Sequence, residues 1–152
     1  MKLGTLCYLR DNGKTLMLHR VKKENDMHHD KWVGLGGKIE PGETPEECII
    51  REVKEESGFT IKNPVYKGIF TLPKFFGNEW KVFVFVANDY TGEIIDSNEG
   101  NLSWIEDHKL KDLDLQESDY MLIDWLDKRE TFSAKFIFDD KKLLSHNVVF
   151  HG

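Results

Sequence analysis

The sequence predicts an α+β fold, a single domain in which a mixed β-sheet lies between helices. Three observations lead to this fold class. The chain has 152 residues, 39% hydrophobic and 32% charged, which suits one compact domain spanning residues 1–152. Segments rich in β-branched and aromatic residues recur along it. Two separated helical patterns interrupt these segments without regular β-α-β alternation, which favours α+β over a parallel α/β sheet.

The chain is predicted to open with a β-hairpin. Residues 4–10 and 15–20 are β-rich, and Asp11, Asn12 and Gly13 between them have hairpin turn chemistry. Residues 21–31, which include His28 and His29, show neither strand nor helix periodicity and predict an exposed loop.

The helix that carries the main motif has well-marked ends. Thr44 suits the N-cap, Pro45 the first helical position, and Glu47 completes a capping box. Gly58 suits the position just after the helix. Before the helix, glycines at 34, 36 and 37 and the Pro41-Gly42 pair predict a tightly turned segment.

Further elements follow this helix. A second helix is predicted over residues 118–129 from the helical spacing of its apolar residues. The nearly continuous apolar run at 80–87 predicts a central strand. The other predicted strands are 65–72, 92–95, 102–105, 132–138 and 148–150.

Composition and charge exclude several classes of function. The two cysteines, Cys7 and Cys48, form no disulfide framework or zinc motif, which favours a reducing compartment. The first apolar run, residues 6–9, is far shorter than a signal sequence or a membrane span. The 21 basic and 27 acidic residues give a net charge of −6, which disfavours long nucleic acid as a partner. We therefore expect a cytoplasmic protein without a membrane partner.

The main helix carries a cluster of carboxylates. Glu52, Glu55 and Glu56 are spaced i, i+3 and i+4, which places them on adjoining parts of one helix face. Between residues 38 and 56, seven acidic and three basic side chains give a net charge of −4. Such a cluster in isolation is most often a solvated helix face. A hard divalent cation would relieve its repulsion, and Mg²⁺ is commonly held by carboxylates together with substrate phosphates.

The residues around the cluster argue against a merely solvated helix face. From Gly37 through Glu43 and Arg51 to Phe59, the chain matches the pattern GX5EX7REUXEEXGU, with U a bulky apolar residue, at every defined position. A chance match in a chain of this length has a frequency of roughly 10⁻⁷. This pattern is the signature of the Nudix hydrolases, which the chain resembles.

The resemblance implies a metal site that cleaves a phosphoanhydride bond. Glu55, Glu56 and the Gly36 carbonyl resemble the family's metal ligands, and Glu52 resembles a residue that serves as ligand or base. Arg51, paired with Glu43 in the preceding loop, resembles the arginine that orients these carboxylates. The expected cofactor is Mg²⁺, with Mn²⁺ as the alternative. Glu99 matches a further carboxylate of MutT-like members, or is an ordinary loop residue.

The residues expected to contact substrate resemble those of the MutT-like branch of the family, which includes oxidised purine nucleoside triphosphatases. Lys38 is expected near phosphate, or else is an exposed turn lysine; Arg20 and Trp32 are expected to contact substrate. Glu117 matches a residue that reads the base edge, or caps the second helix. Phe75, Phe76 and Trp80 are alternative stacking residues, or core. Val33 and Leu115 stand where the oxidised-purine enzymes carry an amide and an aromatic residue, which leaves the base open.

The expected activity is Mg²⁺-dependent hydrolysis of a nucleoside triphosphate, 8-oxo-dGTP or a related purine, to monophosphate and pyrophosphate. The runner-up is a dinucleotide or ADP-ribose pyrophosphatase. A noncatalytic nucleotide-sensing module is the third alternative, disfavoured because every glutamate of the pattern is present.

Overall fold

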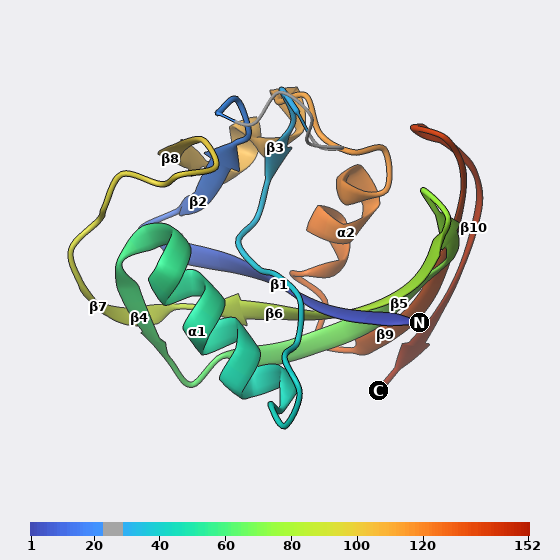
Figure 1. The fold of residues 1–152 in the computed structure, drawn as a ribbon, viewed down its shortest axis with the longest axis horizontal. Helices are drawn as coiled ribbons and strands as arrows, with labels where there is room; N and C mark the ends of the chain where they lie inside the picture. The colour runs from blue at the N-terminus through green and yellow to red at the C-terminus, as the bar shows by residue number, and fades with distance from the viewer. Residues whose placement is uncertain (23–28) are drawn as a thin grey trace.

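The computed structural model describes residues 1–22 and 29–152 (Figure 1). The predicted loop over residues 21–31 therefore lies largely outside the described residues, as does His28. The strands are β1 (Lys2–Asp11), β2 (Lys14–His19), β3 (Trp32–Val33), β4 (Phe59–Lys62), β5 (Val65–Phe75), β6 (Asn78–Ala87), β7 (Asp89–Gly92), β8 (Asn101–Glu106), β9 (Thr131–Asp139) and β10 (Lys142–His151). The helices are α1 (Pro45–Ser57), the 3-10 helix η1 (Asp107–Asp112) and α2 (Asp119–Trp125).

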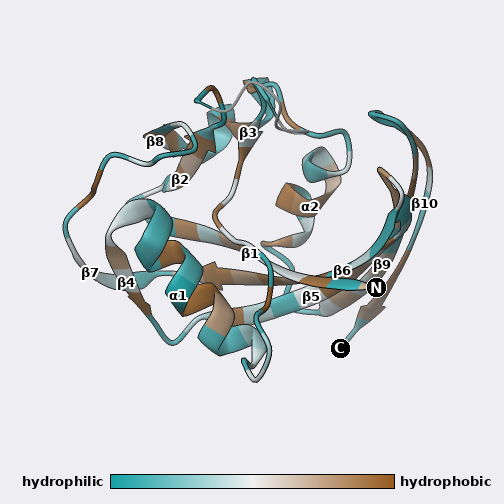
Figure 2. Ribbon diagram, in the orientation of Figure 1, coloured by the Kyte–Doolittle hydropathy of each residue, from teal (hydrophilic) through white to brown (hydrophobic). Residues whose placement is uncertain are grey.

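The main sheet is mixed, which confirms the predicted α+β class. Its strand order is β10-β9-β5-β6-β1-β2-β3, and β8 pairs with β2. The β1/β6 and β5/β9 pairs are parallel, and the remaining pairs are antiparallel. The apolar strand β6 lies in the middle, as its sequence predicts, and Figure 2 shows how hydrophobic it is. A separate two-stranded sheet joins β4 to β7.

The opening hairpin is confirmed. Strand β1 pairs with β2 in a register that places Asp11 opposite Lys14. The two residues between them, Asn12 and Gly13, have φ values of 52° and 74°. This left-handed turn matches the twist of the flanking strands.

Helices α1 and α2 cover opposite faces of the sheet, because successive side chains of a strand point to opposite sides. On β1, Cys7 and Leu9 pack with Ile49 and Val53 of α1, whereas Tyr8 packs in a second cluster with Leu122 of α2. Figure 1 shows the two helices on either side of β1. Figure 2 shows the stripes of apolar and polar residues along α1 that this packing requires.

Several predicted boundaries were wrong. The strand predicted at 92–95 lies earlier, as β7, and ends at Gly92, whose φ of 102° turns the chain. Helix α2 ends at Trp125 rather than at residue 129, because the chain turns after Leu126, the C-cap residue, toward β9. Strand β4 and helix η1 were not predicted, and β10 begins at Lys142 rather than at residue 148. Strand β10 is a mostly exposed edge strand, so it lacks the alternation of buried apolar and exposed polar residues that would mark its start.

In the part of the chain that the structure describes, no helix combines the length and apolar character needed to cross a bilayer. The organisation of residues 1–152 as one domain stays a prediction.

Candidate active site

Helix α1 is fixed at both ends by the predicted caps. The Thr44 hydroxyl accepts a hydrogen bond from the Glu47 backbone N–H at 3.1 Å, and the Glu47 carboxylate accepts one from the Thr44 N–H at 2.9 Å. Gly58 has a φ of 86°, and its N–H donates to the Lys54 carbonyl at 2.9 Å. These ends fix the positions at which the five charged side chains between Arg51 and Glu56 leave the helix.

Arg51 contacts most of the carboxylates of the acidic cluster. Its Nε and Nη2 donate to the two oxygens of Glu43 at 2.7 and 2.9 Å, a bidentate pair. Its Nη1 donates to Glu52 at 2.8 Å and lies 3.4 Å from an oxygen of Glu55. The guanidinium group holds the pKa of Glu43 at about 2, below its usual value. Arg51 also donates to the Lys38 carbonyl at 3.2 Å, which ties the glycine-rich loop to the helix.

Glu56 is the most buried of the box carboxylates. The residue is 8% exposed, and one carboxylate oxygen accepts a hydrogen bond from the Gly36 N–H at 3.3 Å. Burial, followed by the nearby charges of Glu99 and Glu52, raises the pKa of Glu56 to about 9. Burial likewise raises the pKa of Glu52. Three carboxylates therefore share one partly dehydrated region.

Glu99 joins this region from the loop before β8. Its carboxylate accepts a hydrogen bond from Arg20 at 3.4 Å, and its N–H donates to the Ser97 hydroxyl at 3.2 Å. The next residue, Gly100, was not singled out from the sequence. A Cβ atom there would lie 1.9 Å from the carbonyl oxygen of His19, so only glycine lets this loop approach the end of β2.

Two glycines bring the loop before α1 against the cluster. A Cβ atom on Gly36 would lie 2.0 Å from the Thr5 carbonyl oxygen, and one on Gly37 would lie 2.4 Å from the carboxyl carbon of Glu52. The Gly37 carbonyl in turn accepts a hydrogen bond from the Thr5 N–H at 2.8 Å. The loop therefore follows β1 and delivers Gly36 and Lys38 to the carboxylates.

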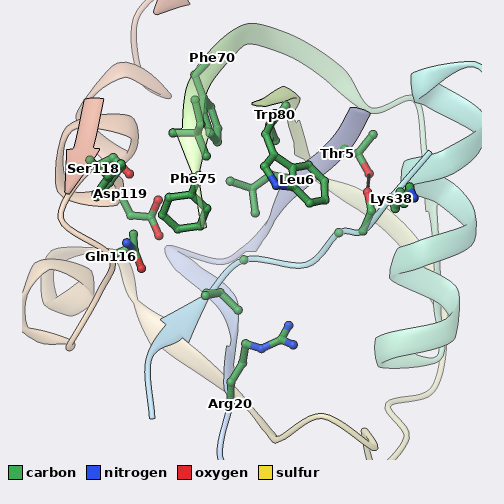
Figure 3. Close-up of a pocket in the computed structure, with 18 residues that line it drawn as sticks. Thr5, Leu6, Arg20, Lys38, Phe70, Phe75, Trp80, Gln116, Ser118 and Asp119 are labelled. Atoms are coloured by element: carbon green, nitrogen blue, oxygen red, sulfur yellow. Dashed lines mark hydrogen bonds between the residues drawn. The ribbon is translucent and has the colours of Figure 1, made fainter. Parts of the chain in front are cut away.

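A cavity of about 260 Å³ extends from this loop to the start of α2 (Figure 3). Aromatic and aliphatic side chains form most of its wall, among them Phe70, Phe75, Trp80, Val82 and Phe138. Its polar groups lie at opposite ends. Gln116, Ser118 and Asp119 lie on the α2 side, whereas Lys38 lies on the side of α1, with Arg20 between β2 and the loop.

The cavity contains some of the predicted substrate residues and not others. Arg20 and Lys38 line it, as do the stacking candidates Phe75 and Trp80. Trp32 is not among its lining residues: the indole ring stacks on His19, with ring centroids 4.5 Å apart and planes 4° apart.

Glu117 also lies outside the cavity. Its carboxylate is exposed and accepts a hydrogen bond from the Leu143 N–H at 2.9 Å. It does not cap α2 either, because Ser118 occupies the N-cap position. The acidic residue that lines the cavity is Asp119, two positions later. Burial raises the pKa of its carboxyl group to about 7.

The acidic cluster suits a divalent cation by its chemistry. Its donors are carboxylate and carbonyl oxygens, the ligands that Mg²⁺ and Mn²⁺ prefer. Burial is the main cause of the raised pKa of Glu56, and a cation would relieve the repulsion from Glu99 and Glu52 that raises it further. Within residues 1–22 and 29–152, no three acidic, histidine or cysteine side chains already form a metal-binding group. Glu52 and Glu55 are instead turned toward Arg51.

This fold and carboxylate cluster are those of a Nudix hydrolase. A model of the NUDIX domain matches residues 2–126, so the chain belongs to the Nudix family. Nudix hydrolases generally use divalent metal ions and act on small nucleotides. The predicted membership, including its MutT-like character, is confirmed.

Individual relatives place the chain among MutT-like members. It is 36% identical over 129 residues to the Nudix hydrolase YvcI of Bacillus subtilis (strain 168), covering 82% of this chain and 78% of that protein. It is 30% identical over 139 residues to the oxidized purine nucleoside triphosphate hydrolase of Danio rerio, covering 90% of this chain and 86% of that one. The crystal structure of a mutator MutT protein from Bacillus halodurans has a TM-score of 0.86 and 32% identity, over 97% of both chains.

Proposed function

We propose that this protein is a Mg²⁺-dependent pyrophosphohydrolase that converts a purine nucleoside triphosphate, such as 8-oxo-dGTP, to the monophosphate and pyrophosphate. One observation carries the proposal. A single cavity joins an aromatic, base-sized region to the basic residues and glycine-rich loop beside the carboxylates. A nucleotide laid along it has its base near α2 and its phosphates near Lys38 and Arg20.

At the phosphate end, we assign complementary roles to the charged residues. Glu52, Glu55, Glu56, Glu99 and the Gly36 carbonyl would hold Mg²⁺, which neutralises phosphate charge when bound. Lys38 and Arg20 would bind phosphate oxygens directly. Arg51 and Glu43 would keep the carboxylates in position without contacting substrate.

Glu52 is the carboxylate that we assign as general base, with a metal-ligand role as the alternative. A base works best when its pKa lies near the working pH, and burial raises the pKa of Glu52. Its hydrogen bond to Arg51 at 2.8 Å fixes one oxygen and leaves the other to accept a proton from the attacking water.

At the base end, Phe75 and Trp80 offer apolar surface to a purine ring. Asp119, rather than Glu117, is assigned to the base edge, with the Gln116 amide beside it. An ionised carboxylate accepts two hydrogen bonds from N–H groups such as those of guanine, whereas a protonated one also donates. The Danio rerio relative, named for oxidized purine triphosphates, supports a purine.

The two alternative functions would require either a larger substrate or a ligand that is bound without being cleaved. ADP-ribose and dinucleotides carry a second nucleoside-sized group, while the cavity volume of about 260 Å³ lies just below the usual range for small-molecule pockets and suits one base. A sensing module without catalysis would not need the full set of box glutamates, all present here.

The test is a panel of purine and pyrimidine triphosphates, ADP-ribose and dinucleotides assayed with Mg²⁺, with products separated by chromatography. We expect monophosphate and pyrophosphate from a purine triphosphate. Glu55→Gln and Glu56→Gln should each lower kcat by at least about 10²-fold while the fold persists. Lys62→Gln, at an exposed position of strand β4, is the matched control and should leave kcat unchanged. Hydrolysis of only ADP-ribose or dinucleotides would replace the proposal with its runner-up.

A further inference from the structure

Tyr8 carries a polar group that the fold does not use. The residue lies in β1 and is 0% exposed, within the apolar cluster under α2. Its hydroxyl group is fully buried and has no hydrogen-bond partner among the residues that the structure describes. Such groups are rare, because a buried donor without a partner costs folding free energy that phenylalanine would not cost. The hydroxyl therefore calls for a role outside packing.

Asp119, at the same end of the cavity, is a second polar side chain with no hydrogen bond to the described residues. It is the first residue of α2, and its carboxyl group points into the cavity beside Phe75 (Figure 3). Burial alone raises its pKa, and no donor from the described residues acts in the opposite direction. One carboxyl group thus lacks donors while a nearby hydroxyl lacks an acceptor.

The two groups are neighbours. Tyr8 packs in one apolar cluster with Phe75, beside which Asp119 lies, and with Leu122, one helical turn after Asp119. The pKa of Tyr8, which burial raises well above its usual value and the charge of Asp119 raises further, agrees with this placement. The Tyr8 ring also lies directly behind the cavity wall: a Cβ atom on Gly34, which lines the cavity, would be 3.3 Å from the ring carbon Cε1. Tyr8 thus supports the end of the cavity at which Asp119 lies.

We propose that Tyr8 is a positioning residue for base recognition, whose hydroxyl donates to one oxygen of Asp119 when a base occupies the cavity and so directs the other oxygen to the base edge. This inference rests on the proposed function, because it assigns the base to this cavity. Tyr8 does not contact the substrate; it acts through Asp119. The pair would set selectivity among bases rather than the rate of phosphate cleavage, which takes place at the other end.

The test compares Tyr8→Phe, Asp119→Asn, the double variant and Tyr66→Phe. Tyr66 is a tyrosine of β5 that is 40% exposed and does not line the cavity, so it is the matched control. Binding of dGMP and dAMP is measured by calorimetry, and kcat and KM are measured for dGTP and dATP. In Tyr8→Phe we expect KM and the monophosphate Kd for the preferred purine to rise about 5- to 10-fold. Its kcat should change by less than about twofold.

Two further readouts separate positioning from packing. Because no described residue forms a hydrogen bond with the hydroxyl, the Tm of Tyr8→Phe should equal or exceed that of the wild type. Because Tyr8 acts through Asp119, adding Tyr8→Phe to Asp119→Asn should not weaken binding further.

Three outcomes would overturn the inference: an unchanged Kd for both monophosphates, a lower Tm with unchanged binding, or effects of the two substitutions that multiply. Absence of turnover on every triphosphate by the wild type would instead defeat the proposed function. Monophosphate binding requires no turnover, so it still tests the pair.

Discussion

At the level of single residues, the buried carboxyl of Glu56 links metal, protons and stability. The carboxyl has a pKa of about 4.5 in the unfolded chain and about 9 in the metal-free fold. Between these values the folded protein binds a proton that the unfolded chain does not. The free energy of unfolding contributed by Glu56 is therefore greatest below pH 4.5 and falls as the pH rises toward 9.

Glu56→Gln should remove this dependence. In chelator, we expect the variant to melt roughly 4–8 °C above the wild type at pH 8 and at nearly the same temperature at pH 5. The measurement is calorimetric Tm against pH. Glu55→Gln is the control, because it removes the same charge at an exposed position of the same helix. The same difference in Tm at both pH values would contradict the burial of Glu56.

Arg51 is the residue whose removal leaves the most carboxylates uncompensated. Arg51→Ala should lower the Tm of the metal-free protein by roughly 4–8 °C and reduce kcat, because Glu43, Glu52 and Glu55 lose their shared partner. Arg51→Lys keeps the charge but not the bidentate geometry. Its Tm and kcat should therefore lie between those of Arg51→Ala and the wild type. Equal Tm values for Arg51→Ala and the wild type would remove Arg51 from this role.

At the scale of elements, α1 depends on its N-terminal cap. Thr44→Ala removes one half of the capping box and should cost about 1 kcal/mol, or roughly 2–4 °C in Tm. We expect kcat/KM to change by less than about twofold, because the pairing of Glu43 with Arg51 remains. Glu47→Ala removes the reciprocal half, and the double variant should lose less than the two losses added together. Strict additivity would show that the two bonds act separately.

Sequence prediction succeeds for features with local signals and fails for features that depend on residues distant in sequence. Helix α1 could be placed from Thr44 and Gly58 because caps are local signals, and its charged residues then fall on one face by periodicity alone. Trp32 and Glu117 could not be placed, since their orientations depend on residues distant in sequence, His19 and Leu143. Asp119 was not predicted because the start of α2 is set by tertiary packing. Glu117 lies two positions earlier, outside the helix, and each helical position turns the side chain by about 100°.

At the scale of the whole molecule, the carboxylate cluster and the cavity should bind their ligands cooperatively. Without a cation, the net charge of −4 between residues 38 and 56 repels phosphates. Calorimetry with chelator should therefore give at least about 10-fold weaker binding of the triphosphate than with Mg²⁺. The corresponding nucleoside, which has no phosphates, should bind equally in both conditions. Unchanged affinity of the triphosphate would mean that Lys38 and Arg20 suffice to hold it.

The two faces of the sheet divide these tasks, and this division has an evolutionary consequence. The carboxylates of α1 rest on one apolar cluster, while Tyr8 and the residues around α2 belong to the other. Strand β9, which contributes Phe138 to the cavity, lies beyond the residues matched by the family model. With the base in this cavity, as proposed, substitutions under α2 and in β9 would exchange one base for another while α1 keeps its support. Descendants of such a chain can acquire new substrates without first losing the old chemistry.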